Sequence, residues 1–228
     1  MVHVQPRVSL SYLQARLRDA LGEDVQNAVF TTSFSKEDQL ILWAIVDAGL
    51  DVELVSLDTG CLFPGTLETW RKTEAQLGVE IQRLTPDAKA VKDWEAEGGM
   101  SAIYQDRASR KACCGLRKLA PLKAALAGKS WWITGLRHAQ SENRSGMEMI
   151  EAAPEWGLTK FHPLLDWSDA LVEAAIEETG VPVNPLYALG YPSVGCAPCT
   201  RPVLPHEPAR AGRWWWEESS RECGLHKG

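Results

Sequence analysis

The chain has 228 residues, of which 45% are hydrophobic, so it is long enough for one α/β domain with a sizeable core. Its formal net charge of −6 at neutral pH argues against non-specific binding of nucleic acid. No apolar run approaches the roughly 18 residues that a membrane-spanning helix needs.

The first ten residues, M-V-H-V-Q-P-R-V-S-L, contain no charged segment followed by an apolar one, so no secretory signal is expected. Hydrophobic periodicity then predicts, in chain order, a helix over residues 9–21, a strand over 25–31, a helix over 38–48, a strand over 52–57, a helix over 66–77, a strand over 79–84, a helix over 116–126, a strand over 131–134 and a helix over 170–178. This alternation predicts an α/β fold with a wound, largely parallel sheet, whose ligands bind at the carboxyl ends of the strands.

The pattern changes after Pro182 to a segment rich in proline, glycine and cysteine, and the last 23 residues are polar and aromatic. We therefore expect an α/β domain over residues 1–205 and a flexible C-terminal tail over residues 206–228. A protein without a secretory signal is expected in the cytoplasm, where thiols stay reduced. Clustered cysteines there indicate metal binding or catalysis more than disulfides.

Two of the six cysteines, Cys113 and Cys114, are adjacent, and a disulfide between neighbours is strained. Cys196 and Cys199 form a C-x-x-C, which alone is typical of a redox dithiol, half of a zinc site or half of a cluster site. Its position in a late loop rich in glycine and proline argues against the redox dithiol.

Together these four thiolates suit zinc or an iron–sulfur cluster. Two adjacent thiolates on one zinc ion would close a small, strained ring, whereas a cluster offers each of them a separate iron. This favours a 4Fe–4S cluster. The structural alternative is that Cys113 and Cys114 are small buried residues at a helix start.

The first strand runs into T-T-S-F-S-K-E-D, residues 31–38, where a hydroxyl-rich turn opens a helix. Backbone N–H groups at a helix N-terminus attract anions, and Ser33 and Ser35 add donors. The segment is not a Walker A loop, and an ordinary N-cap explains the same residues.

Two further loops carry glycine turns, after Leu57 and at Gly135, and basic residues cluster nearby in the sequence. The polar and basic candidates are Arg117, Lys118, Arg137, Gln140, Arg144, Arg210 and Arg213. Basic residues gathered around such loops in an acidic protein predict an anionic small-molecule ligand, although a solvated surface charge explains any single arginine.

From about Ser33 to His226, the chain resembles the assimilatory adenylyl-sulfate (APS) reductases, iron–sulfur members of the 3′-phosphoadenylyl-sulfate (PAPS) reductase family. The motifs that carry the resemblance are T-S-F-S-K-E-D, L-D-T-G-C-L-F-P, C-C-G-L-R-K, W-I-T-G-L-R-H-A-Q-S-E-N-R, G-Y-P-S-V-G-C-A-P-C-T-R, R-A-G-R-W-W-W-E and E-C-G-L-H. His162 and Tyr187 depart from the expected pattern, with Asn and His being common there, and are expected to affect loop packing more than activity.

The resemblance implies an adenine-nucleotide α-hydrolase-like fold, a 4Fe–4S cluster on the four paired cysteines, and Cys223 as nucleophile. It also implies that Lys118 faces both cluster and substrate. The expected substrate-binding residues are Ser33, Phe34, Ser35, Asp38, Leu57, Lys118, Gly135, Arg137, Gln140, Arg144, Arg210 and Arg213.

The chemistry that follows is attack of the Cys223 thiolate on the sulfate sulfur of APS, which expels AMP and leaves an S-sulfocysteine. A thioredoxin or similar dithiol then releases sulfite, in sulfate assimilation and cysteine biosynthesis. Cys61, the only spare cysteine, sits in a turn where an apolar role is favoured over resolving this intermediate. His226 is a candidate to lower the pKa of Cys223 or to hold the tail.

Three alternatives stay open from the sequence. In the first alternative, PAPS, which differs from APS by one 3′-phosphate, is the main substrate or an additional one. A zinc-stabilised thiolation enzyme of the same fold is the second, although Phe34 and Lys36 replace the glycine-rich loop that it needs. A metal-stapled binding module is the third, and it leaves E-C-G-L-H unexplained. The oligomeric state, including a homo-oligomer, is also open.

Overall fold

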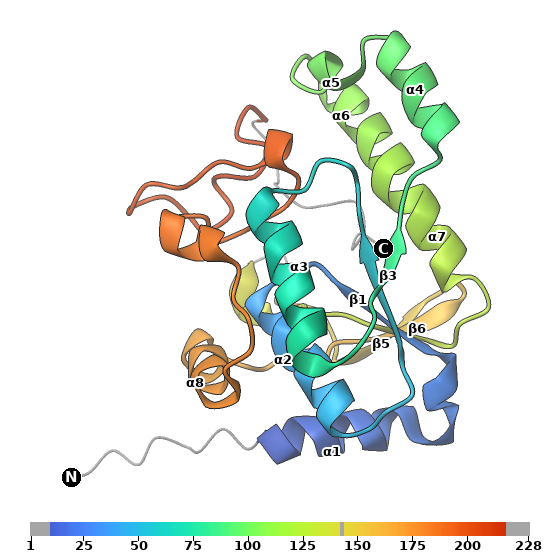
Figure 1. Ribbon diagram of the computed structural model, residues 1–228, viewed down its shortest axis with the longest axis vertical. Helices are drawn as coiled ribbons and strands as arrows, with labels where there is room; N and C mark the ends of the chain where they lie inside the picture. The colour runs from blue at the N-terminus through green and yellow to red at the C-terminus, as the bar shows by residue number, and fades with distance from the viewer. Residues whose placement is uncertain (1–9, 142–143, 218–228) are drawn as a thin grey trace.

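The computed structural model describes residues 10–141 and 144–217, and Figure 1 shows a central sheet with helices packed around it. The sheet has the order β3-β2-β1-β4-β6-β5. Its strands are β1 (Ala28–Thr32), β2 (Glu53–Leu57), β3 (Gln82–Leu84), β4 (Trp131–Ile133), β5 (Ile150–Ala153) and β6 (Leu158–Phe161). Neighbours pair in parallel except β5, which runs antiparallel to β6. The expected wound, largely parallel sheet is confirmed.

Alternation along the strands gives the sheet two apolar faces. In β1, Phe30 packs in one core cluster and Val29 in another, and Ile133 and Trp132 of β4 divide in the same way. The first cluster is covered by α1 (Leu10–Leu21), α2 (Lys36–Asp47), α3 (Pro64–Leu77) and α8 (Asp169–Thr179), and the second by α7 (Ala120–Leu126). The helix predicted over residues 9–21 corresponds to α1, in which Leu10, Leu13, Leu17 and Leu21 are buried.

The order of the strands creates a crevice. The chain passes from β1 to β2 and β3 on one side, and then returns to place β4 on the other side of β1. In a wound sheet, the loops that leave such a pair of strands diverge and open a crevice at their carboxyl ends. The loops after β1 and β4 begin at Ser33 and Thr134, so the predicted ligand-binding segments flank it.

Several predicted boundaries need correction. The strand predicted over 25–31 begins at Ala28, because residues 22–27 form a 3₁₀ turn in which Asn27 Nδ2 donates to Asp24 Oδ1 at 2.5 Å. The strand predicted over 79–84 is only β3, because Glu74 holds the Ile81 N–H at 2.9 Å outside the ladder. Apart from the helix predicted over 116–126, the remaining predicted elements match observed ones to within a few residues.

Other elements were not predicted. The helix expected over 116–126 begins earlier, as α6 (Arg107–Cys114), and runs through a π-helical turn (Gly115–Leu119) into α7. The helices α4 (Ala88–Ala96) and α5 (Gly99–Ala102) precede it, and the β5–β6 hairpin is new.

The chain beyond α8 follows the surface with short 3₁₀ segments and returns to the C-x-x-C loop. Arg201 N donates to Gly212 O at 3.0 Å, and Trp214 N donates to Cys199 O at 3.2 Å. These bonds place the described start of the expected tail against the cysteines, while the division at residue 205 stays a prediction. Cys223 and His226 lie outside the described residues. In the described part of the chain, no helix is long and apolar enough to span a membrane.

Candidate active site

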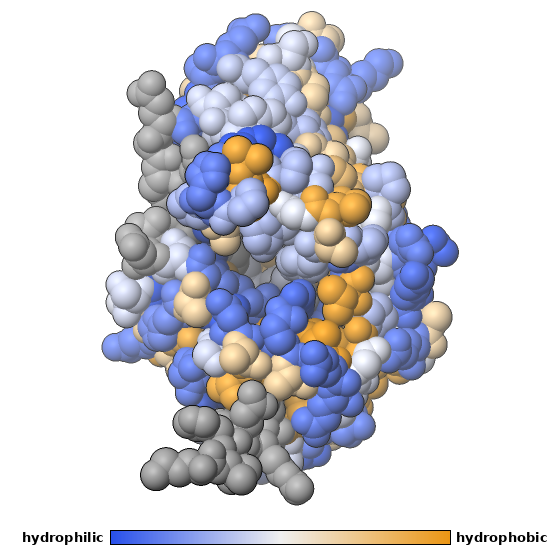
Figure 2. Space-filling view, turned by 90° about the vertical axis from the view of Figure 1, so that its left-hand side faces the viewer, coloured by the Kyte–Doolittle hydropathy of each residue, from blue (hydrophilic) through white to orange (hydrophobic). Residues whose placement is uncertain are grey.

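A cavity of about 470 Å³ opens at the carboxyl edge of the sheet. Figure 2 looks onto the face at the left of Figure 1, where hydrophilic side chains surround a hollow near the middle. The cavity walls come from the loops after β1, β2 and β4, the π-helical turn, and residues 192–196 and 209–213. Every expected substrate-binding residue lines it, namely Ser33, Phe34, Ser35, Asp38, Leu57, Lys118, Gly135, Arg137, Gln140, Arg144, Arg210 and Arg213. Whether they bind substrate stays a proposal.

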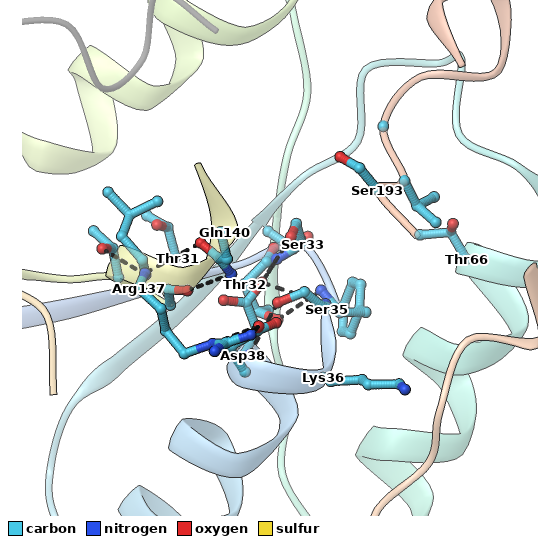
Figure 3. A pocket seen from close by; sticks show the side chains of 18 of the residues that line it. Thr31, Thr32, Ser33, Ser35, Lys36, Asp38, Thr66, Arg137, Gln140 and Ser193 are labelled. Atoms are coloured by element: carbon cyan, nitrogen blue, oxygen red, sulfur yellow. Dashed lines mark hydrogen bonds and ion pairs between the residues drawn. The ribbon is translucent and has the colours of Figure 1, made fainter. Parts of the chain in front are cut away.

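The loop after β1 is organised by Asp38, towards which the serines converge in Figure 3. Asp38 Oδ2 accepts from Ser33 N and Ser33 Oγ, both at 2.7 Å, and from Ser35 N at 3.4 Å. Ser35 Oγ in return accepts from Asp38 N at 3.1 Å, which completes a capping box on α2. Phe34 between them has a φ of 60°, an unusual conformation for a side chain of this size. The ordinary N-cap interpretation is therefore confirmed.

The same geometry makes this end of the cavity unsuited to an anion. Glu37 and Asp38 occupy the first turn of α2, and Asp38 has already taken up the N–H groups of both serines. Burial raises the pKa of Asp38 to about 6, against hydrogen bonds from Ser33 that lower it, and the charge of Glu37 raises it further. An uncharged part of a ligand fits here better than a phosphate or sulfate.

Arg137 is also largely committed to the protein. Its Nε donates to Glu37 Oε1 at 2.8 Å, its Nη1 to Trp167 O at 2.8 Å and its Nη2 to Asp169 Oδ1 at 2.6 Å. Because two carboxylates balance its charge, Arg137 can contribute less to anion binding than the sequence suggested. Its place is in the wall that joins the loop after β4 to α2 and α8.

The end of the cavity beside Cys196 is basic, because Lys118 and Arg213 line it, and Arg144 and Arg210 contribute elsewhere to the lining of the cavity. Arg213 is 7% exposed, yet its Nη1 reaches only Ser193 Oγ and Val194 O, each at 3.3 Å. Within residues 10–141 and 144–217 it forms no ion pair, and its buried Nε has no hydrogen-bond partner. A buried cation without a carboxylate partner is costly, so this end of the cavity is electrostatically prepared for an anionic ligand.

The cysteines meet in a second, small cavity that adjoins the first. Its space of about 20 Å³ is lined by Cys61, Cys113, Cys114, Cys196 and Cys199, all of which have free thiols. Lys118, Arg213 and Cys196 line both cavities, so one basic wall separates the nucleotide-sized cavity from the cysteines.

The thiols differ in acidity. Burial raises the pKa of Cys113 to about 11 and that of Cys199 to about 12. Burial also acts on Cys196, but Lys118, a hydrogen bond with Thr59 Oγ1 at 3.3 Å and Arg213 together lower its pKa. Cys196 therefore forms a thiolate more readily than Cys113 or Cys199, and the thiolate is the form that binds a metal.

Four paired cysteines line this cavity, and the metal group that they bind stays a proposal. Among the described residues, no group of three or more His, Cys, Asp or Glu side chains is arranged to hold a metal ion. A tetrahedral zinc ion would need the four sulfurs to converge on one point, whereas a cluster binds each at a different iron.

An aromatic shell encloses the cysteine cavity on its outer side. Trp214 and Ile103 form a small apolar core with Cys199, joined by Trp94, Met100, Cys113, Cys196 and Trp216. Trp214 has a φ of 44°, which is strained for a large side chain. Arg110 lies over its ring at 4.6 Å and forms a buried two-bond pair with Glu217, so the end of the described chain is fixed to α6.

Sequence reasoning missed some lining residues. Thr59, in L-D-T-G-C, contacts Cys196, and its place directly after a strand was a usable signal. Tyr187, expected to affect loop packing more than activity, lines the large cavity beneath the Lys36 ammonium, whose Nζ lies 5.1 Å from the ring centroid. No sequence pattern pointed to Thr134, which lines the cavity beside Gly135.

Comparison with known proteins gives consistent results. The model of the phosphoadenosine phosphosulfate reductase domain matches residues 27–202. The chain is 48% identical over 200 residues to an adenosine 5′-phosphosulfate reductase of Sinorhizobium fredii, an alignment that covers 87% of this chain and 80% of the relative. It is 42% identical over 230 residues to the protein of that name from Allochromatium vinosum, covering 98% and 90% of the two chains.

Solved structures show the same fold. The phosphoadenylyl-sulfate reductase of Candida auris, determined as a phosphate complex, superposes with a TM-score of 0.70 and 29% identity over 81% of this chain and 88% of that one. An FMN adenylyltransferase of Candida glabrata, at 14% identity and a TM-score of 0.55, covers 96% of this chain and 76% of its own. The second likeness concerns the fold alone.

Proposed function

The chain belongs to the phosphoadenosine phosphosulfate reductase family and is an oxidoreductase that acts on a sulfur group. From this premise we propose that it reduces APS (adenosine 5′-phosphosulfate) to sulfite and AMP. The observation that carries the proposal is the shared basic wall. Lys118 and the uncompensated Arg213 line both the large cavity and the cysteine cavity. A sulfate group at this wall would lie at the basic end of the cavity, beside the cysteines.

The charges of the cavity assign an orientation to the substrate. The acidic and internally bonded loop from Ser33 to Asp38 suits the uncharged adenosine, and the basic end suits the phosphosulfate. We assign the sulfate and phosphate oxygens to Lys118, Arg144, Arg210 and Arg213, whose charges would stabilise the charge that develops on the leaving AMP. In this orientation Arg137 has a structural role, since it holds the loop after β4 to α2 and α8 and does not bind the phosphosulfate.

The nucleophile we propose is Cys223, which lies outside the described residues. Its thiolate forms a bond to the sulfate sulfur while the bond from that sulfur to the phosphate oxygen breaks, and AMP leaves with the electron pair. A thioredoxin thiolate next attacks the Cys223 sulfur and expels sulfite. The second thioredoxin thiol then attacks the mixed disulfide, which returns Cys223 as a thiol and leaves thioredoxin oxidised.

We propose that Cys223 reaches the site from the end of the described chain. Glu217 is held to α6 by Arg110, and Cys223 lies six positions further along the chain, with five residues between them. An extended chain of that length spans at most about 20 Å. We keep His226 as a candidate to lower the pKa of Cys223 or to hold this segment.

The cysteine set is our proposed site for a 4Fe–4S cluster. Cys113, Cys114, Cys196 and Cys199 would hold it, with Lys118 and Arg213 providing positive charge beside the thiolates. When bound, the cluster would supply a covalent link between α6 and the C-x-x-C loop next to the basic end of the cavity. We propose that the enzyme works in the cytoplasm, in sulfate assimilation and cysteine biosynthesis.

The proposal is tested by sulfite release from APS and from PAPS, each with reduced thioredoxin. We expect faster release from APS, and preference for PAPS would transfer the assignment to that substrate. Without reductant, APS should add the mass of one SO₃ group to the peptide that contains Cys223. Cys223→Ser should form no adduct, while Cys61→Ser should form it normally. Sulfite production by Cys223→Ser would show that the nucleophile is wrongly assigned.

A further inference from the structure

A chain of polar side chains crosses the sheet from its edge to the large cavity. His162 directly follows β6 and is fully buried. Its Nδ1 lies 2.6 Å from Thr134 Oγ1, and its Nε2 lies 3.3 Å from Glu151 Oε1 on the edge strand β5. Thr134 in turn lines the cavity at the end of β4. The reaction described above gives these three residues no role.

The partners of His162 determine where its protons lie. A carboxylate only accepts hydrogen bonds, so Nε2 must carry the hydrogen that faces Glu151. The ring is neutral at neutral pH because burial lowers the pKa of His162, and Lys160 and Arg144 lower it further against the opposite effect of Glu151. Neutral His162 with a protonated Nε2 has a lone pair on Nδ1. Thr134 must therefore donate its only hydroxyl hydrogen to His162.

This commitment fixes the turn that follows β4. With its hydrogen directed at His162, Thr134 Oγ1 is left to accept, and the Leu136 N–H donates to it at 3.4 Å. Gln140 holds the same turn by accepting from Arg137 N at 3.1 Å and donating to Gly135 O at 3.2 Å. The hydroxyl direction and the shape of the turn are thus linked.

The turn also abuts the loop after β1. A Cβ at Gly135 would overlap Asp38 Oδ1 and lie 3.2 Å from Glu37 Cβ, so no space is left between the two loops. A displacement of the turn would therefore reach Asp38 and, through it, both N–H groups that Asp38 holds in Ser33 and Ser35. The two loops form the end of the cavity that suits adenosine.

We propose that His162 is a positioning residue for the nucleotide cavity: with Glu151 it sets the hydroxyl of Thr134 as a donor to its ring, and so fixes the turn from Thr134 to Arg137 against the loop of Asp38. The ligand class is an adenine nucleotide, and this inference rests on the proposed function for that choice. The role is indirect, since His162 itself does not line the cavity.

The first test is the tautomer. Proton–nitrogen NMR of the His162 ring in the full-length protein should show hydrogen on Nε2 and none on Nδ1 at neutral pH. Hydrogen on Nδ1 would overturn the inference. This measurement uses neither substrate nor activity, so it stands even if the protein releases no sulfite from APS.

The second test measures the affinity for AMP by calorimetry. Thr134→Val removes the hydroxyl at nearly constant volume and should weaken AMP binding about 5- to 100-fold, the range for one lost buried hydrogen bond, whereas Thr134→Ser should bind normally. His162→Asn keeps an acceptor near Nδ1 and should bind better than His162→Leu. Normal AMP affinity in Thr134→Val would overturn the inference even if His162→Leu fails to fold.

The pH profile separates this role from simple packing. Protonation of His162 makes Nδ1 a donor, which removes the acceptor that Thr134 needs. AMP affinity should therefore fall as the pH drops through the lowered pKa of His162, and the fall should be absent in His162→Asn. Comparing the two proteins cancels the titration of AMP itself. Identical profiles would contradict the proposal, whereas normal AMP binding without sulfite release would contradict the proposed function alone.

Discussion

Two arginines lie over the same indole, but among the described residues only one has a carboxylate partner, so replacing each should separate stability from activity. Arg110 and Arg213 lie 4.6 and 4.8 Å from the ring centroid of Trp214. Arg110 pairs with Glu217 through bonds of 2.7 and 2.9 Å, and the two side chains are only 3% and 7% exposed. Arg213 is equally buried and forms no ion pair in the described part of the chain.

The structure sets the expected size of each effect on stability. Arg110→Met leaves the buried carboxylate of Glu217 with only the longer contact to Arg107 Nε at 4.0 Å, and removing one partner of a buried ion pair typically costs about 3–5 kcal/mol. For a domain of this size each kcal/mol moves the unfolding midpoint by about 2–4 °C, so the expected loss is roughly 6–20 °C. Arg213→Met leaves no carboxylate unpaired, and we expect its midpoint to fall by less than about 4 °C.

The effect on activity has the opposite order. If Arg213 holds the sulfate or phosphate in the transition state, its loss should cost about 2–4 kcal/mol, or roughly a 30- to 1,000-fold decrease in kcat/KM for APS. Arg201→Met is a matched control, because Arg201 pairs with Glu207 on the surface, where the side chains are 33% and 22% exposed. Such a pair contributes little, so both properties should change only slightly.

The assay combines thermal unfolding followed by circular dichroism with initial rates of sulfite release, on anaerobic protein of measured iron content. Equal loss of stability in Arg110→Met and Arg213→Met would show that Arg213 has a partner comparable to Glu217. An unchanged kcat/KM in Arg213→Met would return this arginine to a structural role. Either result refutes the uncompensated cation as the basis for anion binding.

Three further predictions follow from single contacts. Gly135→Ala places a methyl group against Asp38 and should lower AMP affinity at least about 10-fold in calorimetry, whereas Gly146→Ala, which meets open space, should not. The raised pKa of Asp38 makes the unmodified chain lose stability as the pH rises through about 6. Asp38→Asn lacks this carboxyl group, so between pH 4 and 7 its free energy of unfolding should rise by roughly 3 kcal/mol relative to that of the unmodified chain. Equal pH profiles of unfolding for the two proteins would contradict this. Cys196→Ser should lose iron in elemental analysis while Cys61→Ser retains it, and stoichiometric zinc in active protein would exclude the cluster.

The sheet was predictable because its central strands are apolar and lie between amphipathic helices. Phe30 and Val29 show why β1 needs apolar residues at consecutive positions, since both faces of the sheet are covered. The β5–β6 hairpin escaped prediction because β5 is short and carries Glu151, which turns towards His162 instead of solvent alone. Such a contact depends on partners far along the chain, which periodicity cannot detect.

Helix α6 shows a different limit. Its sequence, R-A-S-R-K-A-C-C, has no apolar stripe, because its packing surface consists of cysteines and of Arg110 paired with Glu217. Pro121 occupies the first turn of α7, where a missing N–H is tolerated, and the π-helical turn joins the two helices. The cysteine pair could be recognised from sequence, whereas its helical setting could not.

The cavity lining could be predicted more fully than the balance of charge within it. Arg137 and Arg213 each follow a glycine within two positions, yet Arg137 donates to Glu37 and Asp169, whereas the hydrogen bonds of Arg213 within the described residues go to Ser193 Oγ and the Val194 carbonyl. Only the fold determines which arginine is paired. The assignment of the basic end therefore needed the structure.

The shared wall links the two cavities energetically. Lys118 and Arg213 lower the pKa of Cys196, and the same two cations face the space assigned to the phosphosulfate. Charge coupling is reciprocal, so each negative charge that forms on the cysteines weakens anion binding, and a bound anion in turn raises the pKa of Cys196. Ligation of the thiolates by a cluster would fix their charge in advance. The affinity of the cavity for its anion would then be set by the state of the cysteines, although no cysteine side chain needs to touch the substrate.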